Sequence, residues 1–184
     1  MKAVTAKIQT RFDNIFVATD FSPASAHAIP FGRDLAALSG IQILCFLALS
    51  RLEPQFFIIH LFELIPYIAI IILLACGQQR WAYSVAPLVS LGWLVLAYSS
   101  GILESAVCRL RAFDAAGPEG SLVALLALTT AGLALLMTVV SRIHWVGGFS
   151  GRGRTFSTVL GSLVVVAGYY AALLHWFWDM MRNS

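Results

Sequence analysis

The stretch QFFIIHLFELIPYIAIIILLAC, residues 55–76, decides the fold class of this chain. A helix that crosses the hydrocarbon core of a bilayer needs about 20 predominantly apolar residues, and this run meets that length with only His60 and Glu63 as ionisable residues. Three later runs have the same character. The sequence therefore predicts an all-α membrane protein with four transmembrane helices. The expected spans cover residues 55–76, 82–102, 121–141 and 157–178.

The composition of the whole chain supports the same class. Of the 184 residues, 59% are hydrophobic and 11% are charged, and the mean hydropathy is +0.83. Soluble domains are about half apolar and about a quarter charged. The net charge of +3 is too small for a nucleic-acid-binding surface, so we expect no nucleic-acid partner. Three Cys residues, an odd number, lie in or beside apolar runs, which argues against a secreted disulfide scaffold.

The chain is expected to divide into an N-terminal soluble segment, residues 1–54, and a transmembrane domain, residues 55–184. The apolar run 41–49 is assigned to the soluble segment. Arg51 and Pro54 end this run after about 10 residues, which is too short to span a bilayer. The charges before it are spaced as in ordinary soluble sequence.

The expected location is the inner (plasma) membrane, with both termini in the cytoplasm. Lys2 and Lys7 precede polar sequence rather than the apolar segment of a secretory signal. An even number of spans would return the chain to the side on which it began. That side would carry eight of the twelve Lys and Arg residues, as the positive-inside rule requires of a cytoplasmic side.

A strand–helix–strand unit is expected within the N-terminal segment. Residues 14–20, NIFVATD, predict a short buried strand. Ser22 and Pro23 then predict the start of a helix, and Gly40 predicts its end. Residues 41–46 predict a second strand. One such unit cannot bury a core of its own, so the segment is expected to be βαβ-like or disordered.

Residues 12–46, and above all the VATDFSPAS stretch, resemble the N-terminal fragment of a universal stress protein domain. In members of that family that hold ATP, the Asp after the first strand helps to bind the nucleotide. The resemblance implies that Asp20 is the matching nucleotide-binding candidate here. The family's later glycine-rich phosphate loop has no counterpart, because membrane sequence begins instead. The segment is therefore interpreted as a truncated or fused remnant that packs on a partner subunit.

Ionisable residues are expensive within a membrane and therefore mark candidate sites. His60 and Glu63 are three residues apart on the first expected span, so they share a helix face. His175 and Asp179 are four apart at the end of the fourth expected span and share a face in the same way. Glu104 ends the second expected span. These five side chains are predicted to lie at one depth in the membrane.

Three interpretations of this polar cluster stay open. His60 and His175 are suitable as the two axial ligands of a b-type haem. All five side chains together are suitable ligands for zinc or non-haem iron. In the third interpretation, which we favour, they hydrogen-bond to one another, to headgroups and to neighbouring subunits, and the protein binds no cofactor and no metal.

A second resemblance lies in the membrane part. Residues 96–114, LAYSSGILESAVCRLRAFD, and 126–136, LALTTAGLALL, are similar to a middle segment of cytochrome c oxidase subunit III. Residues 173–181, LLHWFWDMM, are similar to the aromatic-His-aromatic run in the last span of that family. The family has an Asp three residues after the His, whereas here Asp179 follows His175 by four. The resemblance implies a non-redox accessory subunit that carries no metal and stabilises a catalytic partner.

The expected function is a non-catalytic accessory subunit of a multi-subunit membrane complex in respiratory or photosynthetic electron transfer. Its partners would be other membrane subunits and lipids. No Gly-x-Ser-x-Gly, His-Glu-x-x-His or Cys-x-x-Cys motif occurs in the sequence, so hydrolase, zinc-protease and dithiol chemistry gain no support. Two alternatives are a redox subunit that binds haem b through His60 and His175, and a small proton-coupled transporter that uses Glu63 or Glu104.

Overall fold

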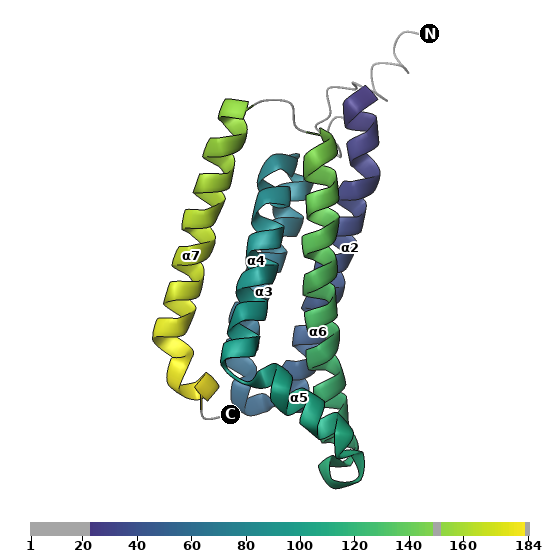
Figure 1. The fold of residues 1–184 in the computed structure, drawn as a ribbon, viewed down its shortest axis with the longest axis vertical. Coiled ribbons are helices and arrows are strands. Elements are labelled where there is room, and N and C mark those ends of the chain that lie inside the picture. The colour runs from purple at the N-terminus through teal and green to yellow at the C-terminus, as the bar shows by residue number, and fades with distance from the viewer. Residues whose placement is uncertain (1–22, 149–151, 183–184) are drawn as a thin grey trace, which may run out of the picture.

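The computed structural model describes residues 23–148 and 152–182, and every element in this part of the chain is helical (Figure 1). Five long helices form a bundle, and a short helix and a turn connect them. The long helices are α2 (Pro23–Leu52), α3 (Phe57–Ala75), α4 (Gln79–Ser99), α6 (Phe113–Gly148) and α7 (Arg152–Arg182). The connecting elements are the 3-10 turn η1 (Pro54–Phe56) and the helix α5 (Ile102–Arg111). The expected all-α, multi-pass class is confirmed.

The prediction of four spans was wrong, because five helices are long and apolar enough to cross a membrane. The additional span is Gly32–Leu52. The apolar run 41–49 ends near Arg51, as this span does, but the span begins earlier, at Gly32. The charges of Arg33 and Asp34 suggested soluble sequence there, whereas they lie in the first turn of the span. The spans are Gly32–Leu52, Pro54–Ala75, Gln79–Ser99, Gly117–Ile143 and Phe156–Phe177.

The expected second strand at residues 41–46 was also wrong, since these residues lie in the middle of α2. A short apolar run has the composition of a buried strand and of a buried helix alike, and its length does not separate them. Packing against the other helices distinguishes the two possibilities. Gln42 and Phe46 are both buried, and residues four apart lie on the same face of a helix. The expected first strand at 14–20 and Asp20 lie outside the described residues.

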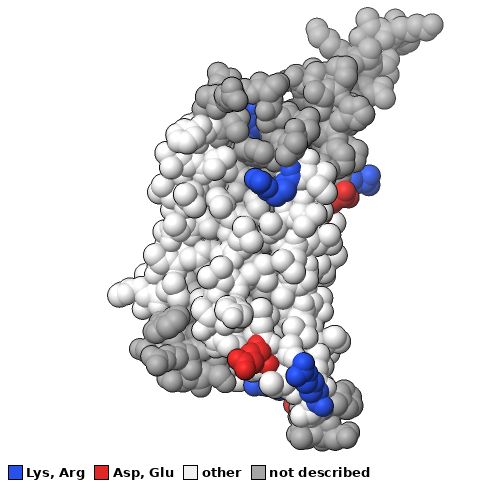
Figure 2. Space-filling view, viewed as in Figure 1, with Lys and Arg blue, Asp and Glu red and all other residues white. Residues whose placement is uncertain are grey.

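The two ends of the described chain lie at opposite ends of the bundle (Figure 1). The expectation that both termini share one side does not hold for these ends, because the number of spans is odd. Helix α5 lies across the end of the bundle where α3 begins and where α4 and α7 end (Figure 1). We call this the α5 end. The charged side chains visible in Figure 2 gather at the two ends and leave a wide uncharged band between them.

Helix α4 lies at the centre of the packing and contacts α3, α6 and α7. Helix α2 packs against α3 and α6 on the other side. Small residues let these backbones approach closely. Membrane helices need such close packing because lipid is as apolar as their side chains, so the hydrophobic effect does not drive them together. Alanines are fully or almost fully buried at several of the contacts, namely Ala82, Ala86, Ala97 and Ala134.

Helix α7 packs closely against α4 at Gly92. A Cβ atom placed on Gly92 of α4 would lie 2.3 Å from the Tyr170 ring of α7. The Tyr170 hydroxyl donates a hydrogen bond to the Val89 carbonyl oxygen at 2.7 Å, which fixes the ring over the glycine. A side chain at Gly92 must therefore displace α7 or break this bond.

We expect Gly92→Ala to lower the stability of the folded protein in detergent by about 1–3 kcal/mol, the usual cost of overpacking. Gly168→Ala on α7 is the matched control, because a Cβ atom there meets nothing within 4 Å. The control should be neutral or stabilising by up to about 1 kcal/mol, since Ala favours helix. Thermal unfolding measures both variants. Equal midpoints for the two would contradict the close α4–α7 contact.

The fifth span also predicts a labelling pattern. Cys76, in the α3–α4 connection, and Cys108, on α5, are both exposed and lie at opposite ends of the bundle. In a variant without native Cys, Arg33→Cys should react with a membrane-impermeant maleimide from the Cys76 side. Four spans would place residue 33 on the Cys108 side instead. Reaction of residue 33 and Cys108 from one side would refute the span Gly32–Leu52.

Candidate functional site

A cavity of about 400 Å³ lies at the α5 end, among α2, α3, α4, α5 and α6. Its walls are mostly apolar and include the rings of Phe46, Phe56 and Trp93. His60 and Glu63 form the polar part of its inner wall. Small-molecule sites in proteins usually have volumes of about 300–1,000 Å³ and combine apolar walls with a few fixed polar groups. This cavity is therefore the candidate site.

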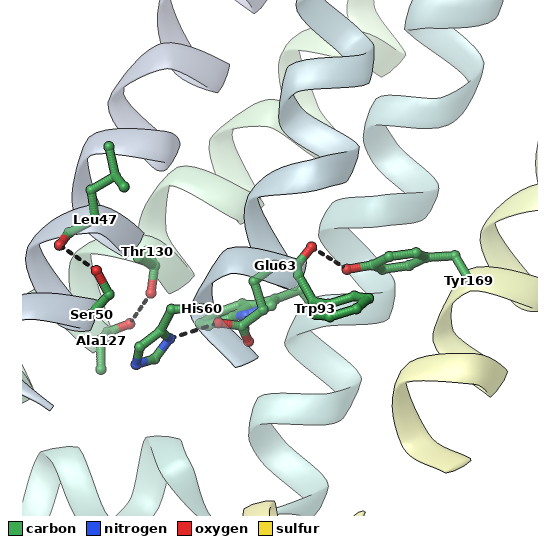
Figure 3. Close-up of polar contacts among 9 residues, drawn as sticks. Leu47, Ser50, His60, Glu63, Trp93, Ala127, Thr130 and Tyr169 are labelled. Carbon is green, nitrogen blue, oxygen red and sulfur yellow. Dashed lines mark hydrogen bonds and ion pairs between the residues drawn. The ribbon is translucent and has the colours of Figure 1, made fainter. Parts of the chain in front are cut away.

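The carboxylate of Glu63 is held by two hydrogen bonds (Figure 3). The indole Nε1 of Trp93, on α4, donates to Oε1 at 2.9 Å. The Nδ1 atom of His60, one turn earlier on α3, lies 3.0 Å from Oε2. Glu63 is only 8% exposed, so both oxygens depend on these partners instead of water. We call His60, Glu63 and Trp93 the α3–α4 polar cluster.

Local helix geometry explains why these groups meet. His60 and Glu63 are three residues apart, so they lie on one face of α3. Phe46 of α2 packs beside the His60 ring, with ring centroids 6.3 Å apart, and beside the Trp93 ring, with centroids 5.9 Å apart. One buried phenyl ring thus contacts both hydrogen-bond donors to Glu63 and restricts their rotation.

The other ring nitrogen of His60, Nε2, points away from Glu63 (Figure 3). It is buried and has no hydrogen-bond partner among the described residues. An ionised carboxylate can only accept hydrogen bonds, so beside Glu63 the proton of a neutral His60 belongs on Nδ1. In that neutral tautomer Nε2 carries a lone pair and can accept a hydrogen bond.

The outer wall of the cavity is polar at the α5 side. A guanidinium nitrogen of Arg109, on α5, lies 3.7 Å from a carboxylate oxygen of Glu53, which precedes η1. Ser100 and Ser105 line the cavity near this pair. Their hydroxyl groups donate to the carbonyl oxygens of Leu96, at 2.8 Å, and Ile102, at 3.0 Å. The ion pair ties α5 to the α2–α3 connection.

The structure brings together only part of the polar cluster expected from the sequence. His60 and Glu63 are in contact, as their spacing predicts. Glu104 is exposed on α5, and His175 is exposed on α7. Neither lines the cavity with His60. The side chain of Asp179 lies outside the described residues.

The haem and metal interpretations gain no support from these positions. His175 does not line the cavity that His60 lines, so the two imidazoles share no wall of it. Within residues 23–148 and 152–182, no group of three or more His, Cys, Asp or Glu side chains that could hold a metal ion is described. Both interpretations therefore stay predictions from the sequence.

Sequence reasoning missed Trp93 and Arg109 as parts of the site. Trp residues near span ends are expected to lie at the headgroup level, but Trp93 is inside a span and 4% exposed. An indole in that position needs an acceptor for its N–H group, and Glu63 was the one carboxylate within an expected span. The hydrogen bond between Trp93 and Glu63 could therefore have been predicted from the sequence. The partner of Arg109 depends on how α5 folds back, which no local pattern gives.

Comparisons with protein-family models, with curated proteins and with solved structures find no match to this chain.

The α3–α4 polar cluster should respond to the loss of either donor. Trp93→Phe leaves Oε1 of Glu63 without its donor, so we expect a loss of about 1–2 kcal/mol of stability. Trp176→Phe is the matched control, because Trp176 is 64% exposed on α7, and it should change stability by less than about 0.5 kcal/mol. Unfolding in detergent measures both. A Trp93→Phe variant as stable as the control would mean that the indole–carboxylate bond contributes nothing.

Proposed function

We propose that the chain is an integral-membrane accessory subunit whose own contribution is a binding site for a small lipid-soluble molecule. One observation carries this proposal: His60, whose Nε2 atom is buried without a hydrogen-bond partner among the described residues, lines a cavity of about 400 Å³. Buried polar atoms are usually paired in folded proteins. Of the unpaired buried side-chain atoms among the described residues, this one belongs to a residue that lines the cavity, so a bound molecule is the partner that we propose for it.

The surroundings of His60 support binding over a purely structural role. A His that only stabilises packing needs one partner, and Glu63 supplies it. The Trp93 bond adds a second constraint on the same carboxylate and so fixes the direction of the imidazole. Binding sites show this arrangement because a held side chain loses little entropy when its ligand arrives.

The exposed surface of α7 favours the accessory-subunit part of the proposal. This helix contacts chiefly α4, and large apolar side chains cover its outer face. Lipid or the helices of a partner subunit can cover that face, and the complex that we propose is one of respiratory or photosynthetic electron transfer. The outer face includes Phe156, Val164, Val165 and Trp176.

We further propose that the α5 end faces away from the cytoplasm across the inner (plasma) membrane. Four of the twelve Lys and Arg residues lie at or beyond this end, and the other eight lie at the opposite end or precede α2 in the sequence. The positive-inside rule assigns the richer end to the cytoplasm. The cavity would then lie near the outer side of the membrane.

Photolabelling with a small lipid-soluble probe, 3-trifluoromethyl-3-phenyldiazirine, tests the binding site. Phe46 and Ala106 line the cavity, yet they are only 1% and 3% exposed, so lipid alone cannot deliver the probe to them. We expect labelled peptides that contain both residues. Val165, which is 65% exposed on α7, reports the general lipid-facing labelling.

The variant Ala127→Phe should remove the labels at Phe46 and Ala106, because Ala127 lines the cavity and a phenyl ring there fills part of it. Labelling at Val165 should stay unchanged. Ala124→Leu, a smaller change on the same wall, should lower the labelling of Phe46 and Ala106 in part. This second variant keeps the test decisive if Ala127→Phe does not fold. Labels confined to lipid-facing residues in the unmodified protein would overturn the proposed site.

A further inference from the structure

We infer that the cavity binds a zwitterionic amphiphile, a molecule with one apolar chain and a head that carries both a phosphate and a primary ammonium group. This inference rests on the proposed function and names the class of its ligand. It follows from the order of polar and apolar groups along the cavity, from the depth of each group in the membrane, and from two opposite charges at one end.

Polar and apolar groups are separated along the cavity. Two charged side chains and one amide line it where α5 faces the α2–α3 connection, and we call these three residues, Glu53, Gln55 and Arg109, the mouth. The inner walls carry aromatic and aliphatic side chains. The α3–α4 polar cluster also lies there, but both oxygens of its carboxylate already have partners. A ligand that fits has a polar end at the mouth and an apolar end inside.

The mouth lies at the depth of lipid headgroups. The spans Gly32–Leu52 and Pro54–Ala75 meet at Glu53, and α5, which carries Arg109, lies outside the five spans found among the described residues. The inner walls belong to the spans themselves and so lie at the depth of the hydrocarbon core, which is about 30 Å thick. An amphiphile from the bilayer can therefore keep its head and its chain at their ordinary depths when it occupies the cavity.

The two charges at the mouth are near each other but are not joined by a hydrogen bond. A guanidinium nitrogen of Arg109 lies 3.7 Å from a carboxylate oxygen of Glu53, whereas hydrogen bonds between such groups are about 2.7–3.2 Å long. Arg109 is 42% exposed and Glu53 is 20% exposed. Exposed ion pairs contribute little to stability, so a ligand can separate these two groups at little cost.

A head with both signs of charge matches the mouth better than a head with one. A head with only negative charge meets the carboxylate of Glu53, and a head with only positive charge meets the guanidinium of Arg109. A phosphate accepts hydrogen bonds from the guanidinium and from the amide of Gln55. A primary ammonium offers three N–H donors to Glu53, whereas a trimethylammonium offers none. Phosphoethanolamine carries both of the groups that the mouth pairs.

The size of the cavity favours a ligand with a single chain. Its volume of about 400 Å³ is near the lower limit of the usual range for ligand sites, about 300–1,000 Å³. Suitable probes are therefore lysophospholipids, which keep the head and the glycerol but have one acyl chain.

Competition with the diazirine tests the inference on the full chain in phosphatidylcholine nanodiscs. The competitors share a lauroyl chain and differ in the head: lysophosphatidylethanolamine, lysophosphatidylcholine and lysophosphatidylglycerol. The ethanolamine lipid should suppress the labelling of Phe46 and Ala106 at about a fivefold lower mole fraction than the other two. It alone combines zero net charge with ammonium N–H donors. Labelling of Val165, which faces lipid, is the internal standard. Equal midpoints for the three lipids, or a lower midpoint for either of the others, would overturn the inference.

The head without a chain distinguishes a lipid site from a site for free phosphate compounds. Glycerophosphoethanolamine should compete at least about a hundredfold more weakly than the lysolipid, because it leaves the apolar inner walls without a partner. Competition as strong as that of the lysolipid would show that the chain is not recognised and would contradict an amphiphile.

Variants of the mouth test which groups read the head. Glu53→Gln removes the charge that the ammonium pairs, so the ethanolamine and choline lipids should compete within about twofold of each other. The same variant should favour the anionic glycerol lipid. Arg109→Gln should weaken all three lipids, because all three carry phosphate. Glu104→Gln and Arg111→Gln are matched controls that should change no midpoint, since both residues are exposed on α5 and do not line the cavity.

An ethanolamine preference that persists in Glu53→Gln would overturn the role of the mouth and with it the inference. If the diazirine labels Phe46 and Ala106 but the three lipids compete equally, the ligand class is wrong and the proposed site stands. If the diazirine labels neither residue, both proposals fail.

Discussion

A carboxylate buried among membrane helices must find donors within the protein, and this requirement shapes the α5 end of the bundle. Glu63 is 8% exposed, and its two oxygens are paired with side chains from α3 and α4. The pairing sets the rotation of α4, because Trp93 must face α3. It also sets the packing of α2, whose Phe46 contacts both donor rings. The same bonds that offset the cost of burial leave one atom of His60 free for another partner.

Much of the fold follows from apolar run length, and the exceptions have physical causes. The predicted spans 55–76, 82–102, 121–141 and 157–178 match four of the observed helices within a few residues, because the bilayer imposes one length on all of them. The span Gly32–Leu52 was not predicted, because Arg33 and Asp34 suggested soluble sequence although they lie in the first turn of the span. Gly40, expected to stop a helix, lies within α2, where neighbouring helices stabilise a residue that is unfavourable by itself.

The candidate site divides in the same way between local and tertiary information. His60 and Glu63 could be paired from the sequence, because their three-residue spacing fixes one helix face. The four-residue spacing of His175 and Asp179 likewise places them on one face of α7. The sequence of α7 alone does not show which other helix that face contacts. His175 turned out to be exposed, while the contribution of Trp93 and of α5 comes from tertiary packing. The composition of the candidate site depends on that second kind of information.

The central claim is that Glu63 orients His60 through a hydrogen bond that the Nδ1 atom of His60 donates, and so fixes the direction in which Nε2 points. Nitrogen-15 NMR of the protein labelled at His ring nitrogens, in nanodiscs at neutral pH, tests this most directly, with His60→Leu used to assign the signals. The account predicts a proton on the Nδ1 atom of His60, the atom that faces Glu63. A His60 whose only ring proton is on Nε2 would contradict it.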